Sequence, residues 1–173
     1  MDIKKIKSGK NPENGEVNVF IEIPKASDVK YELNENSGVI FVDRFMFTAF
    51  SYPFNYGFVP NTLGEDGDPL DVLVLCEKSV QPGTVIPAVV IGMLEMEDEK
   101  GIDAKILAVP EIKIDPVFGE WKDVNDIPEI TKKKIKHFFD HMKELEPGKW
   151  VKTKDFLGKT QAIEEVKKAM EKK

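Results

Sequence analysis

Three aspartates lie within six residues in the run Asp66-Gly67-Asp68-Pro69-Leu70-Asp71. Carboxylates this close raise one another's pKa and repel, whereas a hard divalent cation that prefers oxygen ligands turns the same crowding into a binding site. The run is not an EF-hand loop, because counting from Asp66 places Leu70 at position 5 and Asp71 at position 6, where that loop needs an acid or amide and a glycine. An acidic turn without a ligand is the alternative, because Asp, Gly and Pro all favour turns.

A second acidic pair, Asp98 and Asp103, flanks the dipeptide Lys100-Gly101 between two strand-like segments. This turn predicts a hairpin in which the two carboxylates lie opposite each other. Apolar and polar residues alternate after the turn, so Asp103 and Lys105 are expected on the same face of the strand. Like charges directly opposite each other destabilise a sheet, which favours a bound cation, whereas ordinary charge on a solvated hairpin tip is the alternative.

Further charged residues fall inside apolar, strand-like segments. Lys30 and Glu32 share the polar face of one predicted strand. Residues 39–44 predict a buried strand that ends in Arg44, and Glu22 lies among the apolar residues of another strand, where it needs a partner. A surface ion pair such as Lys30 with Glu32, worth about 0 to 1 kcal/mol, is the alternative for any one of these residues.

Together these residues give four or five carboxylates suited to Mg²⁺ and several cations suited to phosphate. Two metal ions about 3.5 to 4 Å apart can clamp the attacking and leaving oxygens of an in-line displacement. Lys and Arg can stabilise the charge on the phosphoryl group, and a further carboxylate can act as general base on a metal-held water. The set therefore predicts chemistry on a metal-bridged polyanion.

The sequence resembles the soluble family I inorganic pyrophosphatases of the prokaryotic type, from about Val17 to Val151. The segments that carry the resemblance are Glu22-Ile23-Pro24, Lys30-Tyr31-Glu32, Phe41-Val42-Asp43-Arg44-Phe45-Met46, Tyr52-Pro53-Phe54-Asn55-Tyr56-Gly57, Asp66-Gly67-Asp68-Pro69-Leu70-Asp71-Val72, Asp98 through Val109-Pro110, and His137-Phe138-Phe139. The pattern Asp-Gly-Asp-Pro-x-Asp is specific to the family, and the other segments agree with it in order and spacing.

The resemblance implies hydrolysis of pyrophosphate to two orthophosphates with about two to four Mg²⁺ ions per site, Mn²⁺ and Co²⁺ being alternatives. Asp66, Asp71 and Asp103 would hold the first ion, and Asp71 would bridge to a second. Asp98 and Asp103 would hold a further ion that arrives with the substrate. Asp68 would be the general base that deprotonates the water shared by the first two ions.

The resemblance also implies the residues that bind the substrate. Contacts with phosphate or with the rest of the site would come from Lys30, Arg44, Tyr56, Lys105 and Lys143. Arg44 is suited to bidentate phosphate recognition. Tyr52 would support the site, Glu32 would serve as an outer metal ligand, and Glu22 would serve an outer metal or water position.

One position departs from the family pattern. The family usually carries a tyrosine before the lysine that corresponds to Lys143, whereas this chain has Met142, which cannot donate a hydrogen bond. On a helix predicted from Pro128 to Glu146, Met142 falls in the apolar stripe and is therefore expected in the core. We expect catalysis to survive and a phosphate contact to be lost.

Composition sets the broad class. A chain of 173 residues fits one domain, residues 1–173, with a sizeable core, and 25 basic against 31 acidic residues disfavour a nucleic-acid surface. The single Cys76, within a predicted buried strand, is expected to be a packed thiol in a reducing cytoplasm. Residues 1–10 lack the apolar segment of a signal peptide, and no run is long enough for a membrane span.

Short strands separated by turn signals are expected from Val17 to Val109, followed by two helices. One helix is expected to begin at residues 126–128 and end at residues 147–148, and the other to run from Thr160 to Glu171. This is an α+β chain, mainly β: a small closed barrel, OB-like by resemblance, with both C-terminal helices outside and the site in its mouth. Prokaryotic members of the family are commonly hexamers, and the first helix is a candidate interface.

Two motif matches point elsewhere and are disfavoured. Gly158-Lys159-Thr160 mimics the end of a phosphate-binding P-loop, but the leading glycine would fall at Thr153. His137 and His141 are spaced as in the zinc motif HExxH, yet Phe138 replaces the required glutamate.

Two other functional classes remain as alternatives. An acidic Ca²⁺-binding barrel module without catalysis would explain the aspartates but not Lys30, Arg44 and Lys105. A Mg²⁺-dependent nucleoside polyphosphate hydrolase would need a base-binding pocket that the sequence does not indicate.

Overall fold

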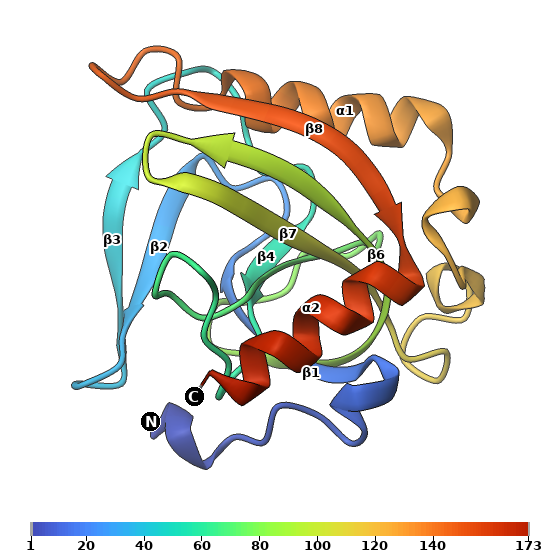
Figure 1. Ribbon diagram of the computed structural model, residues 1–173. Helices are drawn as coiled ribbons and strands as arrows, with labels where there is room; N and C mark the ends of the chain where they lie inside the picture. Colours follow the sequence, from blue (N-terminus) through green and yellow to red (C-terminus); the bar gives the residue numbers. More distant parts are fainter. Residues whose placement is uncertain (1, 173) are drawn as a thin grey trace.

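The computed structural model describes residues 2–172, which form eight strands, two α-helices and four short 3-10 helices (Figure 1). The strands are β1 (Glu16–Ile23), β2 (Val29–Asn34), β3 (Val39–Phe45), β4 (Asn55–Phe58), β5 (Asp71–Val74), β6 (Val85–Asp98), β7 (Gly101–Pro110) and β8 (Val151–Gly158). The α-helices are α1 (Glu129–His141) and α2 (Lys159–Glu171), and the 3-10 helices are η1 (Ile3–Lys5), η2 (Pro12–Asn14), η3 (Phe118–Glu120) and η4 (Val124–Asp126).

Six strands pair in the order β1-β4-β5-β7-β6-β8, and β1 also pairs with β6. The first part of β1, from Glu16 to Phe20, pairs with β6, and the part from Phe20 to Ile23 pairs with β4. The sequence of pairings therefore returns to β1. All contacts are antiparallel except that between β5 and β7, which is parallel. The prediction of a mainly β chain with two helices is confirmed.

The buried apolar residues form two main clusters, and one helix packs in each cluster. Alternate residues of β1, Val17, Val19 and Ile21, pack in the same cluster as Val166 and other small apolar residues of α2. This is the period-two pattern of a strand meeting the apolar stripe of a helix. The other cluster includes Ile23 at the end of β1 and the buried residues of α1. Figure 1 shows α1 and α2 on different sides of the sheet.

Helix α1 ends earlier than the sequence predicts. It begins at Glu129, close to the expected position, but its last residue is His141, with Met142 as the C-cap, instead of continuing to residues 147–148. Burial explains the difference, because the apolar stripe stops at Met142 and Leu145 is 61% exposed. Helical segments in proteins are held chiefly by packing of their apolar face, and the last expected turn has none.

Strands β2 and β3 form a separate two-stranded sheet, drawn at the left of Figure 1. The prediction that residues 39–44 form a buried strand is wrong, since Phe41 and Val42 are each 54% exposed. The apolar composition of β3 is typical of a core strand, but within the described residues β3 pairs only with β2, and the exposed residues leave one face of this hairpin uncovered.

Cys76 is buried, as expected, although it lies two residues beyond the end of β5 and not inside the strand. The side-chain amide of Asn55 donates to its Sγ and also to the carbonyl of Lys78. Burial raises the pKa of the Cys76 thiol.

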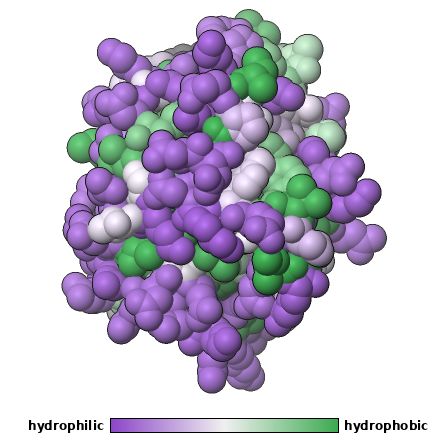
Figure 2. Space-filling view, turned by 90° about the vertical axis from the view of Figure 1, so that its right-hand side faces the viewer, coloured by the Kyte–Doolittle hydropathy of each residue, from purple (hydrophilic) through white to green (hydrophobic). Residues whose placement is uncertain are grey.

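Among residues 2–172, no helix is both long and apolar enough to cross a membrane. The face drawn in Figure 2, which is the right-hand side of Figure 1, is mostly hydrophilic, and its hydrophobic residues form separate small groups.

Candidate active site

One cavity brings together most of the residues that the sequence singled out. The expected site residues that line it are Lys30, Arg44, Tyr52, Tyr56, Asp66, Asp68, Asp71, Asp98, Asp103, Lys105, Met142 and Lys143. A neighbouring cavity shares five of these residues and is also lined by Glu22 and Glu32. Every residue predicted for the site therefore lies on one of two adjoining cavities, although the residues come from segments far apart in the sequence.

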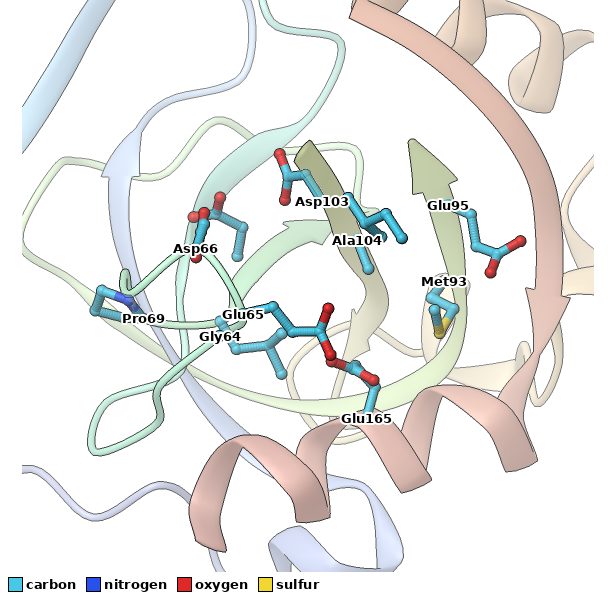
Figure 3. A pocket seen from close by; sticks show the side chains of 12 residues that line it. Gly64, Glu65, Asp66, Pro69, Met93, Glu95, Asp103, Ala104 and Glu165 are labelled. Carbon is cyan, nitrogen blue, oxygen red and sulfur yellow. The ribbon is translucent and has the colours of Figure 1, made fainter. Parts of the chain in front are cut away.

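A further cavity adjoins the site on the side of α2 (Figure 3). Asp66 and Asp103 lie on the part of this cavity that borders the site, and Glu65 and Glu165 approach each other across it. Asp66 and Asp103 therefore border two cavities, the candidate site and the cavity beside α2.

The aspartates of the loop between β4 and β5 are positioned by a tight turn. The backbone N–H of Asp68 donates to the side chain of Asp66, and Gly64 N–H donates to the carbonyl of Asp68. Gly67 has a φ of +87°, a conformation that favours glycine, and a side chain there would be strained. Asp71 follows as the first residue of β5, which aligns it with the strand.

The β6–β7 hairpin has a different register from the one predicted. Asp98 pairs with Gly101, and Asp103 pairs with Met96, so the two aspartates are not directly opposite each other. The turn is formed by Glu99 and Lys100, one residue earlier than predicted, and the side chain of Asp98 accepts the N–H of Lys100. The two carboxylates still line the same cavity, because Gly101 and Asp103 are two residues apart on one strand.

Lys105 lies between two of the carboxylates. Its Nζ is 2.5 Å from Asp71 Oδ2 and 2.7 Å from Asp103 Oδ2, and the residue is only 6% exposed. Burial alone would lower the pKa of this ammonium, but Asp71, Tyr56 and Asp103 raise it well above its usual value. The prediction that Asp103 and Lys105 share a face is confirmed. Burial also raises the pKa of Asp103, and Lys105 offsets part of that rise.

The other expected phosphate-binding cations are also paired with carboxylates. Arg44 donates from Nε to Asp43 at 2.6 Å and from Nη1 to Glu146. Lys30 lies 3.3 Å from Asp43 and 3.8 Å from Glu32, and Lys143 lies 3.1 Å from Asp98. The positive charges thus line the cavity without being buried and unpaired.

Glu22 has the partner that its apolar surroundings require. Its Oε1 accepts the backbone N–H of Leu33 on β2 at 2.7 Å, which joins β1 to the β2–β3 hairpin. Burial raises the pKa of Glu22 to about 7, and the hydrogen bond from Leu33 offsets part of this rise.

Tyr52 and Tyr56 are buried with their rings 5.4 Å apart. Burial raises the pKa of both phenols, so both are protonated at neutral pH and can donate a hydrogen bond.

Met142 is 8% exposed and packs in the same cluster as Phe138 and Phe139, which confirms its interpretation as a core residue. It also lines the cavity, beside Lys143. Sequence reasoning missed several charged neighbours that the structure places on the cavity wall: Glu99, Glu146 and Lys149. The sequence indicates these residues only weakly, because Glu146 and Lys149 differ from other surface charges only in lying three and six positions after Lys143.

The donor set is the kind that a hard divalent cation prefers, since it consists of carboxylate oxygens. Among residues 2–172, no three acidic, histidine or cysteine side chains are grouped closely enough to hold an ion. Lys105 supplies the positive charge between Asp71 and Asp103 instead. Because the residue types fit Mg²⁺, the site is suited to an ion that competes with this ammonium.

The two competing motifs do not have the required surroundings. Gly158 precedes α2 at the end of β8, but β8 pairs antiparallel with β6, whereas a P-loop belongs to a parallel sheet. The ring of His137 contacts Phe50 edge-on, and His141 Nδ1 lies 3.0 Å from Glu144, so the surroundings of the two histidines are aromatic and acidic side chains.

Comparison with known proteins identifies the family. Residues 19–173 match the family model described as inorganic pyrophosphatase. The chain belongs to the inorganic pyrophosphatase family. It is 56% identical over 171 residues to an inorganic pyrophosphatase of Aquifex pyrophilus, with 99% of this chain and 96% of that protein covered. It is 57% identical over 158 residues to an inorganic pyrophosphatase of Saccharolobus solfataricus, with 91% and 92% covered.

The fold is also that of solved pyrophosphatases. The structure of an inorganic pyrophosphatase from Helicobacter pylori matches with a TM-score of 0.93 at 48% identity, covering 97% of this chain and 98% of that one. The resemblance found in the sequence is therefore confirmed at the level of the family, and the cavity described above belongs to a pyrophosphatase fold.

Proposed function

We propose that this chain hydrolyses inorganic pyrophosphate to two orthophosphates in the presence of a divalent metal, with Asp68 as the general base. The observation that carries the proposal is the single cavity in which five aspartates face Lys30, Arg44 and Lys143, in a chain of the inorganic pyrophosphatase family. Carboxylates suit the metal and the cations suit the phosphates, so both parts of a metal–pyrophosphate substrate have matching groups.

The carboxylates have distinct roles in this proposal. Asp66, Asp71 and Asp103 would hold the first ion, with Asp71 shared by a second, and Asp98 would contribute to a further one. Mg²⁺ is the proposed metal, with Mn²⁺ and Co²⁺ as alternatives and about two to four ions per site. When bound, such ions make a held water acidic enough to yield hydroxide near neutral pH. Asp68 is exposed on its loop and lines the cavity, where it would take that proton.

The cations and phenols bind and orient the substrate. Arg44, Lys30 and Lys143 would each exchange one carboxylate partner (Glu146, Asp43 and Asp98, respectively) for phosphate oxygens, which gives each cation a charged partner before and after binding. Lys105, which pairs with Asp71 and Asp103, would contact phosphate and support the site. Tyr56 would donate its phenolic proton, Tyr52 would support it, and Glu32 with Glu22 would serve outer positions.

The enzyme interpretation explains more than the two alternatives. A Ca²⁺-binding module leaves the three cations on the cavity wall without a role. A nucleoside polyphosphate hydrolase would need aromatic side chains that hold the nucleobase, but Tyr52 and Tyr56 of the cavity are buried and pack against each other. The direct test is phosphate release from pyrophosphate and from ATP with Mg²⁺, and again in EDTA. We expect fast release from pyrophosphate only with metal; equal release in EDTA, or a preference for ATP, would overturn the proposal.

Substitution of two neighbouring aspartates separates proton transfer from metal binding. Asp68→Asn should lower kcat on the order of 10² to 10⁴-fold while metal affinity is retained. Asp71→Asn should weaken metal affinity itself, because it removes a shared ligand. Calorimetric titration with Mn²⁺ measures both variants, and an equal loss of affinity would remove the distinction.

Several finer properties follow from the same resemblance. We propose one domain over residues 1–173 and an OB-like closed barrel, supported by the pairing of β1 with both β4 and β6. We also propose a cytoplasmic homo-hexamer, with the outer side of α1 as a candidate interface and the uncovered face of the β2–β3 hairpin as a second. Sedimentation equilibrium tests the hexamer, and a monomer at micromolar concentration would exclude it.

A further inference from the structure

The partner of Arg44 across the cavity is a carboxylate that no role above accounts for. Arg44 Nη1 donates to Glu146 Oε1, and the two residues are 102 positions apart in the sequence. Arg44 lies on β3, in the separate hairpin, whereas Glu146 lies in the turns that follow α1. The pair therefore joins the separate hairpin to these turns at the cavity.

The side chain of Glu146 is largely buried, and its backbone is hydrogen-bonded within the turns. Its side chain is only 10% exposed, whereas that of Glu144, two residues earlier, is 50% exposed and pairs with His141. Its backbone N–H donates to the carbonyl of Lys143, and its carbonyl accepts the N–H of Lys149. A carboxylate this well buried needs a cation, because desolvation of an unpaired charge is costly.

We propose that Glu146 is a positioning residue that competes with phosphate for Arg44. Between turnovers its carboxylate holds the guanidinium in the cavity, and after hydrolysis it recaptures the guanidinium and lowers the affinity of the site for the orthophosphate product. This inference rests on the proposed function, because it assigns Arg44 to phosphate binding.

The charges explain why competition is expected. Asp43 already occupies Nε of the guanidinium, so a phosphate that approaches from the cavity must use the terminal nitrogens, one of which donates to Glu146. Glu146 and a bound phosphate would both be anions next to one cation, Arg44, in a partly desolvated cavity, and they would repel each other. A weaker interaction of Glu146 with Arg44 would therefore strengthen phosphate binding. The same contact keeps the flexible Arg44 side chain oriented, which reduces the entropy lost when substrate binds.

Two substitutions separate the competition of Glu146 with phosphate from its orientation of Arg44. In Glu146→Gln the amide oxygen can still accept from Arg44 while the negative charge is removed. We expect the Kd of orthophosphate, measured by calorimetry with Mg²⁺, and its Ki against pyrophosphate hydrolysis to fall about three- to tenfold. In Glu146→Ala the orientation is lost as well, so KM for pyrophosphate should be higher than in the glutamine variant. Glu144→Gln removes the same charge from the same segment outside the cavity and should leave phosphate affinity unchanged.

A double-mutant cycle tests whether the competition is for Arg44. In an Arg44→Met background, Glu146→Gln should no longer change the Ki of phosphate. If the effect persists there, Glu146 acts by general repulsion and the inference is wrong; an unchanged or weaker phosphate affinity in the single variant also overturns it.

Should the glutamine variant not fold, Glu146→Asp withdraws the charge by one methylene and is expected to tighten phosphate binding in the same direction. Absence of metal-dependent hydrolysis by the unsubstituted protein would instead refute the proposed function.

Discussion

At the scale of single residues, each cation of the site forms an ion pair with a carboxylate of the cavity wall. Lys105 is the clearest case, because its ammonium lies within 2.7 Å of both Asp71 and Asp103 and neutralises part of their repulsion. A divalent ion carries more charge than the ammonium and would compete with it for these carboxylates. Under the proposed function, Lys105 would then be available to phosphate, and the binding of metal and of substrate would be linked through one side chain.

Glu22 should make the metal-free protein less stable as pH rises. Its pKa is raised from 4.5 to about 7 in the folded state, so between these values the folded protein holds a proton that the unfolded chain has lost. Stability is therefore highest below pH 4.5 for this group and declines through pH 7, by roughly 3 kcal/mol in total. In Glu22→Gln, which can still accept from Leu33, this decline should be absent. Urea unfolding in EDTA from pH 5 to pH 8 measures the difference between the two proteins, and parallel pH profiles would contradict the prediction.

Met142→Tyr should restore a phosphate contact. The side chain lies at the end of α1, packed on Phe138 and Phe139 and bordering the cavity next to Lys143. A neutral hydrogen bond contributes about 0.5 to 1.5 kcal/mol, so phosphate and pyrophosphate should bind roughly two- to tenfold more tightly if the phenol reaches the cavity. KM for pyrophosphate and Ki for phosphate test this, and Met142→Phe, which has the ring without the hydroxyl, is the matched control.

At the scale of elements, the close approach of β1 and β4 sets a steric limit beneath the site. Gly57 pairs with Ile21, and a Cβ at Gly57 would lie 1.8 Å from the carbonyl oxygen of Phe20. Gly57→Ala should therefore force the strands apart and destabilise the protein by about 1 to 3 kcal/mol or more. Gly148→Ala is the contrasting variant, since its φ is +72° but nothing lies within 4 Å of the added Cβ, so its cost is only that of the backbone conformation. Equal urea midpoints for the two variants would argue against the steric explanation.

The sequence predicts elements well where the pattern has one cause. The acidic run, the positions of α2 and most strands, and the shared face of Asp103 and Lys105 follow from turn chemistry and period-two or helical spacing. Where tertiary packing decides, prediction fails. The apolar content of β3 does not distinguish a core strand from an uncovered hairpin, and the end of α1 depends on whether Leu145 finds a neighbour.

The candidate site was predictable to a similar extent. Charge and spacing singled out most of the fourteen named residues, the family resemblance added Tyr52, Tyr56 and Lys143, and the structure places each of the fourteen on the two adjoining cavities. The partner of Arg44 across the cavity, Glu146, was not predictable, because a pair 102 positions apart leaves no local pattern.

At the scale of the whole molecule, divalent metal should stabilise the fold. An ion that binds only the folded state adds RT ln(1 + [L]/Kd), about 2.7 kcal/mol at a hundredfold excess over Kd. We expect millimolar Mg²⁺ to raise Tm at constant ionic strength and Asp71→Asn to reduce that rise. A Tm that does not respond to Mg²⁺ would be inconsistent with an intact metal site.

The burial of Cys76 gives the protein an internal reporter of its own motions. It is the only thiol in the sequence, it is 4% exposed, and Asn55, which donates to it, also accepts the N–H groups of Lys25 and Val80. A thiol reagent can therefore react only from conformations in which this junction has opened. The alkylation rate of Cys76 would report how often the structure opens just beyond the end of β5. If metal and pyrophosphate slow this alkylation, their binding in the cavity also restricts motion at Cys76.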